Sequence, residues 1–492
     1  MIQRVTLAAV MLYCTSAPIA GAQEHRPEVR DRPSSQPPRQ DIQMLGEPQP
    51  RYATSAAIQL QPAAPDLLKD ALSRPAMNLS DFEQLALANN PTLQQANAIT
   101  RRSAGQARQA GLFPNPMAGY VGEEIRGGSY GGGEQGAFVQ QTIPLGGKLG
   151  LRRQVFEEQK REDEIGVTLQ RYRVLSDVRQ SFYAALAAQE TVKLQGNLLS
   201  VAADAVQTVH QLANVGQADA PDVLQAEVEA EQTATDYTAS QRMFIQKFSS
   251  LAAETGRPEL PLGPLQGELE NPPRIESEQL EKRILEESPE VKRAEQAVIR
   301  AEAELKSASR ERVPDVQLRA GLQQSNEPVN EITGKPVGLL GFVTIGVTLP
   351  LFNRNQGNVE AARADLERAR SEVTRLRLSL RQRVQPLLQT YLADRDRVDR
   401  YKTEMIPRAT RAYQLYLSKY QQMGQAYPQV IVSQRTLFQI QATYLQVLQD
   451  LWTSAIRLQN YALSGGLDAP AAAGRAGTNS NSSSLAGSAP AD

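Results

Sequence analysis

Cysteine and histidine are nearly absent from this chain. Its 492 residues include one cysteine and two histidines. Cys14 falls inside a predicted export signal, so the mature protein is expected to have neither a disulfide nor a thiolate metal ligand. His25 and His210 are isolated, whereas a metal centre needs several N, O or S donors together. The sequence therefore predicts no metal site, no cofactor and no catalytic constellation, and we do not expect an enzyme.

An excess of one charge and a long apolar run are also missing. Lys and Arg number 53 against 54 Asp and Glu, so no net field attracts nucleic acid or an anionic membrane surface. The basic pairs at 101–102, 152–153 and 160–161 form no continuous patch with interleaved aromatics, and we expect no nucleic-acid partner. After the signal, no stretch reaches the roughly 18 apolar residues of a membrane helix. If the chain crosses a bilayer, it must do so with β-strands.

The two ends of the chain differ in composition from its middle. Arg4, the apolar stretch 5–13 and the small residues 20–22 are typical of a signal peptide, with cleavage after Ala22. Lipidation of Cys14 is the alternative, and the bulky residue before it disfavours that processing. We predict a signal peptide at 1–22, a disordered Pro-rich lead-in at 23–77, a first repeat at 78–256, a linker at 257–276, a second repeat at 277–466 and a disordered tail at 467–492.

The middle of the chain is duplicated at an offset of about 200 residues. Matching segments follow the same order in both halves: 88–93 with 287–291, Phe113-Pro114-Asn115 with Val313-Pro314-Asp315, Thr142-Ile143-Pro144-Leu145 with Thr348-Leu349-Pro350-Leu351, and Gly216-Gln217-Ala218 with Gly424-Gln425-Ala426. This offset is much longer than the roughly 20–50 residues of a solenoid repeat. It indicates a duplicated half-protein in which each half builds the same elements.

Long helices are predicted in both halves. Apolar residues recur at steps of three and four from Ala362 to Tyr391 and from Leu437 to Tyr461, the spacing of helices that pack along their whole length. Segments 149–213 and 357–421 would each span roughly 97 Å at about 1.5 Å per residue. The predicted helices 80–110, 222–255, 277–310 and 430–462 are about half as long. Two short helices stacked end to end would therefore match one long helix.

Capping residues and prolines predict where these helices begin and break. Ser80 and Glu83 have the spacing of a capping box, which would open the first helix. Pro386 and Pro407 lie inside the second long helix and are expected to kink or interrupt it.

Between the helices, two pairs of strands are predicted. Residues 316–323 alternate apolar Val316, Leu318, Ala320 and Leu322 with Gln317, Arg319, Gly321 and Gln323. The same period of two runs through 342–349, and the segments 117–125 and 136–143 occupy the equivalent places in the first half. Such alternation gives one apolar and one polar face. The loops 126–135 and 324–340 would join the strands as hairpins.

Strands of this length suit an outer-membrane barrel, which needs about 9–11 residues per strand. Four strands cannot close a barrel, whose minimum is about eight, and open edges are not tolerated in lipid. The chain is therefore expected to oligomerise, and three copies would supply twelve strands.

The sequence resembles the TolC-like outer-membrane efflux proteins. The resemblance covers roughly 78–466 and rests on the duplicated strand–strand–helix order, the proline after each second strand, and the Gly-Gln-Ala turns at 216–218 and 424–426. The runs 112–116 and 349–357 resemble the heavy-metal branch, exemplified by cobalt–zinc–cadmium resistance systems.

This resemblance implies a mainly α fold with a small β part, internally duplicated. It implies a homotrimeric channel-tunnel: a twelve-stranded barrel in outer-membrane lipid that continues as a coiled-coil helical barrel through the periplasm. The implied partners are a periplasmic adaptor (membrane fusion protein) and an inner-membrane pump of the resistance-nodulation-division (RND) type. The implied function is passive export, with heavy-metal cations as cargo.

The two turns between helices are the candidate functional sites. Gly216 and Gly424 suit the left-handed conformation that ends a helix, and Pro221 and Pro428 stand where the next helix begins. The expected adaptor contacts at the periplasmic tip are Gly216, Gln217, Ala218, Gly424, Gln425 and Ala426.

Acidic residues follow only the first of these turns. In a trimer, Asp219 and Asp222 would form rings of carboxylates favourable to entering cations, at a constriction of the pore. The alternative is that they only cap the following helix. The second turn has Tyr427 and no acid.

Two other functions remain open at this stage. An efflux channel for drugs or organic compounds would need the same architecture, because selectivity normally belongs to the pump and the adaptor. A periplasmic coiled-coil adaptor without a pore would explain the helices and leave the alternating strands without a purpose.

Overall fold

The structure is a computed structural model that describes residues 68–71, 73–123, 125, 133–276, 279–328, 336–422 and 427–471. All of these residues belong to one compact unit, Pro62–Asp492. The predicted signal peptide and most of the predicted lead-in and tail lie outside the described residues.

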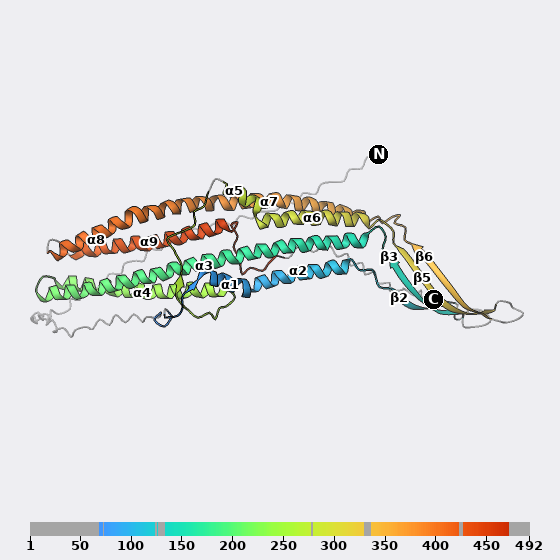
Figure 1. Ribbon diagram of the computed structural model, residues 1–492, viewed down its shortest axis with the longest axis horizontal. Coiled ribbons are helices and arrows are strands. Elements are labelled where there is room, and N and C mark those ends of the chain that lie inside the picture. The colour runs from blue at the N-terminus through green and yellow to red at the C-terminus, as the bar shows by residue number, and fades with distance from the viewer. Residues whose placement is uncertain are drawn as a thin grey trace, which may run out of the picture. The chain divides into compact units, whose positions relative to one another are not determined.

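Each half of the chain contributes two short helices, a pair of strands and then longer helices (Figure 1). The first half contains β1 (Met77–Asn78), α1 (Leu79–Asn89), α2 (Pro91–Ala110), β2 (Met117–Glu123), β3 (Glu134–Ile143), α3 (Lys148–Asn214) and α4 (Ala220–Glu254). The second half contains β4 (Leu265–Gln266), α5 (Leu280–Glu287), α6 (Pro289–Arg310), β5 (Val316–Pro328), β6 (Pro336–Val347), α7 (Gln356–Arg400), the π-helical segment η1 (Tyr401–Met405), α8 (Ile406–Gln421) and α9 (Tyr427–Gln459). The predicted duplication of elements is confirmed.

The helices pack side by side along their length (Figure 1). The 67-residue α3 contacts α2 and α4, which lie one after the other along it, and also α6 and α9. In the second half, α7 contacts α6 and α9, and α8 contacts α9. Two short helices therefore match one long helix, as the lengths predicted. None of the helices in the described ranges combines the length and hydropathy of a membrane-spanning segment.

Two helices predicted as continuous are each broken at a proline. Asn90 and Ser288 precede Pro91 and Pro289 and adopt ψ values of 122° and 126°, outside the helical range. A residue before proline is pushed out of the α region by the proline ring. The repeated motif that revealed the duplication therefore marks the same helix break in both halves.

The predicted capping box at Ser80 is wrong. The helix begins one residue earlier, at Leu79, and Asn78 is its N-cap. The Asn78 Oδ1 accepts the Asp81 backbone N–H at 3.2 Å, and the Asp81 Oδ2 accepts the Asn78 N–H at 2.9 Å. Asn78 and Asp81 therefore form the capping box, two residues before the expected Ser80 and Glu83.

Proline 407 interrupts the second long helix, as predicted. The chain forms the π-helical segment η1 just before it, and α8 starts at Ile406 with Pro407 in its first turn. Proline cannot donate a backbone hydrogen bond, and a π-helical turn accommodates the missing bond. Pro386, by contrast, lies inside α7 without ending it.

The four long strands form one antiparallel sheet in the order β2-β3-β5-β6. The two halves of the chain meet in its middle, where β3 pairs with β5 from Glu134–Ser325 to Ile143–Val316. β5 and β6 are longer than predicted and reach Pro328 and Pro336, whereas β2 ends at Glu123. The edges of the sheet are β2 and β6.

An aromatic core joins the two halves. The Phe82 ring packs against those of Phe182 and Phe248, with centroids 5.8 and 6.1 Å apart. Tyr183 on α3 stacks on Trp452 of α9 at 3.5 Å. The Trp452 Nε1–H donates to the Leu269 carbonyl at 2.7 Å, in the segment between β4 and α5, so the stacked ring joins the two halves and the hydrogen bond fixes Trp452 within its own half.

Buried charges also join the halves. Glu162 of α3 is 7% exposed and accepts the Nε–H of Arg300 from α6 at 2.9 Å. Arg293 of α6 lies 3.8 Å from the same carboxylate, and Arg300 also pairs with Glu304. The α3–α6 contact therefore has a charge network in place of a purely apolar seam.

Candidate functional site

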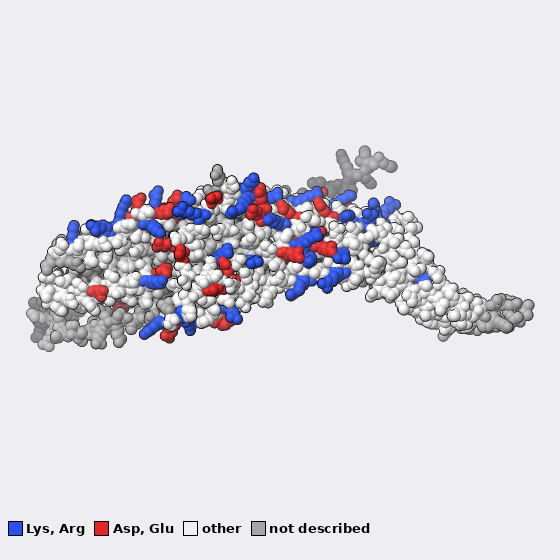
Figure 2. All heavy atoms as spheres, viewed as in Figure 1, with Lys and Arg blue, Asp and Glu red and all other residues white. Residues whose placement is uncertain are grey.

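The sheet has two faces of opposite character. By register, Val343 and Ile345 share one face with Leu318 and Leu322. Val343 and Ile345 are each 69% exposed, so this apolar face is uncovered within the chain. On the side shown in Figure 2, charged side chains gather over the helices and are sparse over the sheet.

The first turn ends α3 in the way its glycine predicted. Gly216 has φ +72°, the left-handed conformation that glycine adopts without a Cβ clash. Its N–H donates to the Ala213 carbonyl at 3.0 Å, and the Gln217 N–H donates to the Leu212 carbonyl at 2.8 Å. These two bonds define a Schellman motif, which satisfies carbonyls at the helix end.

Asp219 and Asp222 lie at the start of α4, directly after this turn. Asp219 is the N-cap residue, but its side chain makes no capping hydrogen bond. It is exposed, and Asp222 is half-buried in the first turn of the helix. Pro221 stands within the first two positions, as predicted. Asp219 therefore caps the helix only with its backbone carbonyl, which accepts the Asp222 N–H. Its carboxylate takes no part in the cap.

The turn of the second half lies outside the described residues. This concerns Gly424, Gln425 and Ala426, and the Tyr427 side chain is likewise not described. The helix leading to it nevertheless approaches the first turn. Burial raises the pKa of the Tyr420 phenol on α8, and the nearby Asp222 carboxylate raises it further.

His210 pairs with a glutamate of the neighbouring helix. Its ring Nε2 lies 3.1 Å from the Glu227 Oε1, so the pair links the end of α3 to α4. Within the residues that the structure describes, no group of three or more His, Cys, Asp or Glu side chains is placed to hold a metal ion.

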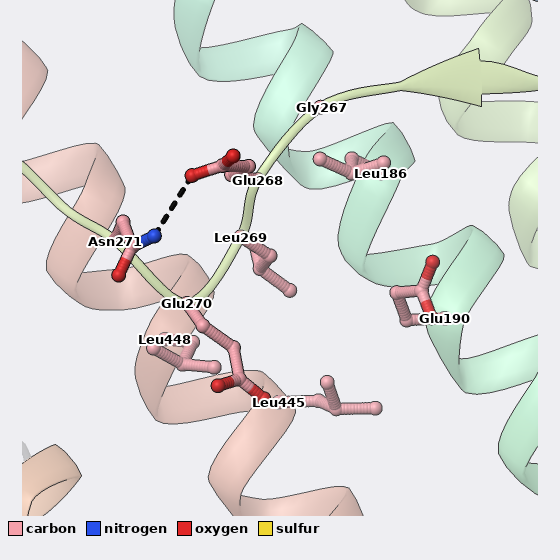
Figure 3. Close-up of a pocket in the computed structure, with 9 residues that line it drawn as sticks. All are labelled: Leu186, Glu190, Gly267, Glu268, Leu269, Glu270, Asn271, Leu445 and Leu448. Atoms are coloured by element: carbon pink, nitrogen blue, oxygen red, sulfur yellow. Dashed lines mark hydrogen bonds between the residues drawn. The ribbon is translucent and has the colours of Figure 1, made fainter.

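A cavity of about 290 Å³ opens between α3, the segment 267–271 and α9 (Figure 3). Three carboxylates line it: Glu190, Glu268 and Glu270. Each has a partner within hydrogen-bond distance, namely Lys193 at 2.7 Å, Asn271 at 2.8 Å and Lys402 at 2.8 Å, respectively. Only the Glu270–Lys402 pair joins segments distant in the chain, and all three carboxylates have partners, unlike the free groups that converge in a catalytic site.

Two carboxyls lie where the end of α4 meets α3 and the segment after α9. The Asp177 Oδ2 accepts the backbone N–H groups of Gly465 and Gly466 at 2.9 and 2.6 Å. The Glu254 Oε1 accepts the Ser181 hydroxyl at 2.8 Å. Burial raises the pKa of both carboxyls, that of Glu254 from 4.5 to about 7, and the Asp177 charge adds to the effect on Glu254.

An uncovered apolar sheet face and a duplicated helical framework fit the subunit of a membrane channel. The chain belongs to the outer membrane efflux protein family, whose profile matches residues 83–257 and 280–464. It is therefore a passive channel component and not an enzyme, located in the outer membrane and extending into the periplasm.

Individual relatives agree with this placement. The cobalt-zinc-cadmium resistance protein CzcC of Cupriavidus metallidurans is 26% identical over 376 residues, 75% of this chain and 86% of that protein. The nickel-cobalt-cadmium resistance protein NccC of Alcaligenes xylosoxydans xylosoxydans is 24% identical over 301 residues, 60% of this chain and 66% of that protein. The Campylobacter jejuni CmeC outer membrane channel has the same fold, with a TM-score of 0.64, 16% identity, and coverage of 78% of this chain and 85% of that one.

Sequence reasoning did not single out the carboxyls Asp177 and Glu254. Their partners are distant in the chain: Gly465 lies 288 residues from Asp177. No local motif signals such a contact.

Proposed function

We propose that three copies of the chain close a channel through the outer membrane. The sheet of one chain leaves the edges β2 and β6 without a strand partner among the described residues. Unpaired edges are not tolerated in lipid, so β2 of one copy would pair with β6 of the next. The open edges together with the uncovered apolar face carry this proposal.

Adjacent residues on opposite sheet faces offer a matched test. Val343→Lys places a charge on the apolar face and Thr344→Lys places it on the polar face. A lysine facing lipid near the bilayer midplane costs about 2–4 kcal/mol per copy. We expect V343K to lower the yield of trimer extracted from outer membranes, and T344K to resemble the wild type. Wild-type protein that is monomeric in detergent and does not conduct in planar bilayers would refute the channel.

The channel is further proposed to work with a periplasmic adaptor and an RND-type pump, with its helix turns as the docking tip. Around the first turn, Val215, Leu224 and Val228 are 68%, 61% and 64% exposed. Apolar side chains gathered at an exposed turn are typical of a protein interface. Gly216, Gln217 and Ala218 would present the backbone there, and Gly424, Gln425 and Ala426 would do so in the second half.

Charge substitutions at Leu224 test this docking. We expect Leu224→Glu to abolish adaptor cross-linking in cells without changing the amount of trimer. The exposed Leu378 on α7 (61%) provides a control site away from the turn. Equal adaptor cross-linking by L224E and L378E would contradict docking at the turn.

Heavy-metal cations are the proposed cargo class. This rests on the similarity to the cobalt-zinc-cadmium resistance protein, which extends over 75% of the chain. Deletion of the gene should increase sensitivity to zinc, cobalt or cadmium in graded growth assays. Sensitivity to antibiotics or organic compounds alone would instead favour a channel for those compounds.

Asp219 and Asp222 are proposed to line the periplasmic constriction. Their threefold repetition would concentrate cations at the entrance. The double variant D219N/D222N should reduce the cation preference of the channel in planar bilayers, whereas D236N, on the same helix but away from the turn, should not. Identical reversal potentials for the double variant and D236N would show that the two acids only belong to the helix start.

A further inference from the structure

Arg319 is the only basic residue within the four strands as the structure assigns them. It lies on β5, directly opposite Gln140 on β3 and Thr344 on β6. By register it shares the polar face of the sheet with Gln317 and Gln323. A positive charge therefore stands on the face that is turned away from the uncovered apolar side chains.

Two aromatic rings hold this guanidinium. Its central carbon lies 3.9 Å from the centroid of Phe138 and 5.6 Å from that of Phe342. Both distances are within the range of cation–π attraction, which extends to about 6 Å. The guanidinium thus lies between rings from the two strands that flank β5.

Glycines let both rings lie close to the sheet. A Cβ added at Gly119 would come within 2.6 Å of the Phe138 ring, and one at Gly321 within 2.7 Å of the Phe342 ring. Glycine in a strand often marks such a close approach. Gly119 lies directly opposite Phe138, and Gly321 lies directly opposite Phe342. Each ring can therefore lie over a glycine and contact the Arg319 guanidinium.

The charge of Arg319 is not cancelled within the described part of the chain. No described carboxylate pairs with it, and its buried Nε–H has no acceptor there. Glu134, on β3, lies opposite Ser325 and accepts from Gln323. Six strand positions separate Ser325 from Arg319, or about 20 Å at about 3.3 Å per residue. The aromatic quadrupoles stabilise the guanidinium but leave its net charge in place.

We propose that Arg319, held on Phe138 and Phe342, is an anion-favouring selectivity site inside the β-section of the channel. This rests on the proposed trimer, in which the polar face lines the aqueous passage and three copies of Arg319 form one ring. Rings of arginine or lysine in a pore favour anions. The channel then has fixed charges of opposite sign in its two sections, with carboxylates at the helix turn and guanidiniums among the strands.

This assignment restricts the form in which a metal passes the strands. A bare divalent cation is disfavoured at a ring of three guanidiniums, whereas a neutral or anionic complex is not. The chemical class that the site favours is therefore small anions and anionic complexes, with chloride as the simplest probe.

Reversal potentials in planar bilayers test the proposal. Purified full-length protein is measured in a potassium chloride gradient, as wild type and as R319Q, R319K, Q140E and R257Q. We expect R319Q to lower the chloride-to-potassium permeability ratio on the order of fivefold, with a larger effect at low salt. R319K retains the charge and should stay near the wild type.

Two further variants make the test independent of how well R319Q folds. Q140E places a carboxylate opposite Arg319, and it should shift selectivity toward potassium as R319Q does. R257Q removes an exposed positive charge after α4 and should leave the ratio unchanged. Conducting R319Q and Q140E channels with the wild-type permeability ratio would overturn the selectivity site while leaving the channel intact. Wild-type protein that does not conduct would instead refute the channel, and the site with it.

Discussion

Replacing Glu254 by glutamine makes the stability of the protein depend less on pH. The Glu254 carboxyl is buried beside Asp177, and its pKa is raised from 4.5 to about 7. The difference corresponds to about 3 kcal/mol of less favourable ionisation in the folded protein than in the unfolded chain. Glutamine keeps the shape of the side chain and an oxygen that can accept from the Ser181 hydroxyl.

The sign follows from proton binding. Because the folded state holds this proton more tightly, the stabilising contribution of the neutral carboxyl is complete below pH 4.5. It is lost as the pH rises through about 7, where the folded protein must accept a buried charge. The variant E254Q should therefore match the wild type in acid and exceed it in stability at alkaline pH.

Thermal unfolding of the purified channel measures this difference. We expect the midpoint of E254Q to lie a few degrees above that of the wild type at about pH 8.5, with no gap at about pH 4. Glu259 is an exposed carboxylate five residues away, so E259Q is the matched control. A gap of the same size at both pH values, or an equal gap in E259Q, would refute the reasoning.

Four further substitutions test the framework. E162Q leaves the buried Arg300 with one carboxylate partner fewer and should cost about 3 kcal/mol or more in unfolding free energy, measured by denaturant titration. G216A forces a left-handed alanine and should cost about 1 kcal/mol, whereas G150A, in a helix with open space at the Cβ, should stabilise by up to about 1 kcal/mol. W452F keeps a ring in the core but leaves a buried carbonyl unpaired, so its unfolding midpoint should fall by the equivalent of about 1–3 kcal/mol.

The main architecture could be predicted because it follows from periodicity. Apolar residues at steps of three and four predicted long helices. The observed α3 extends one residue beyond its predicted range at each end. The period of two predicted the two strands of the second half, and the duplication predicted the equivalent pair in the first half. The helix breaks at Asn90 and Ser288 were missed, although each residue precedes a proline, which disfavours the helical conformation there.

The details that periodicity does not encode could not be predicted. The N-cap at Asn78 competes with Ser80 for the same role, and only the local backbone decides between them. The pairing of β3 with β5 joins segments from different halves. The Arg319 guanidinium contacts two phenylalanines on different strands, and only the strand register places them beside it.

The central strand pair has a consequence for how the protein is made. Ile143 pairs with Val316, about 170 positions later in the chain. During synthesis and export, the strands β2 and β3 are therefore made well before β5 exists. Contacts so distant in sequence form slowly, and an uncovered strand is a template for aggregation until they do. The duplicated halves cannot mature one after the other as independent domains, and the newly exported chain should depend on a holding chaperone until β5 arrives.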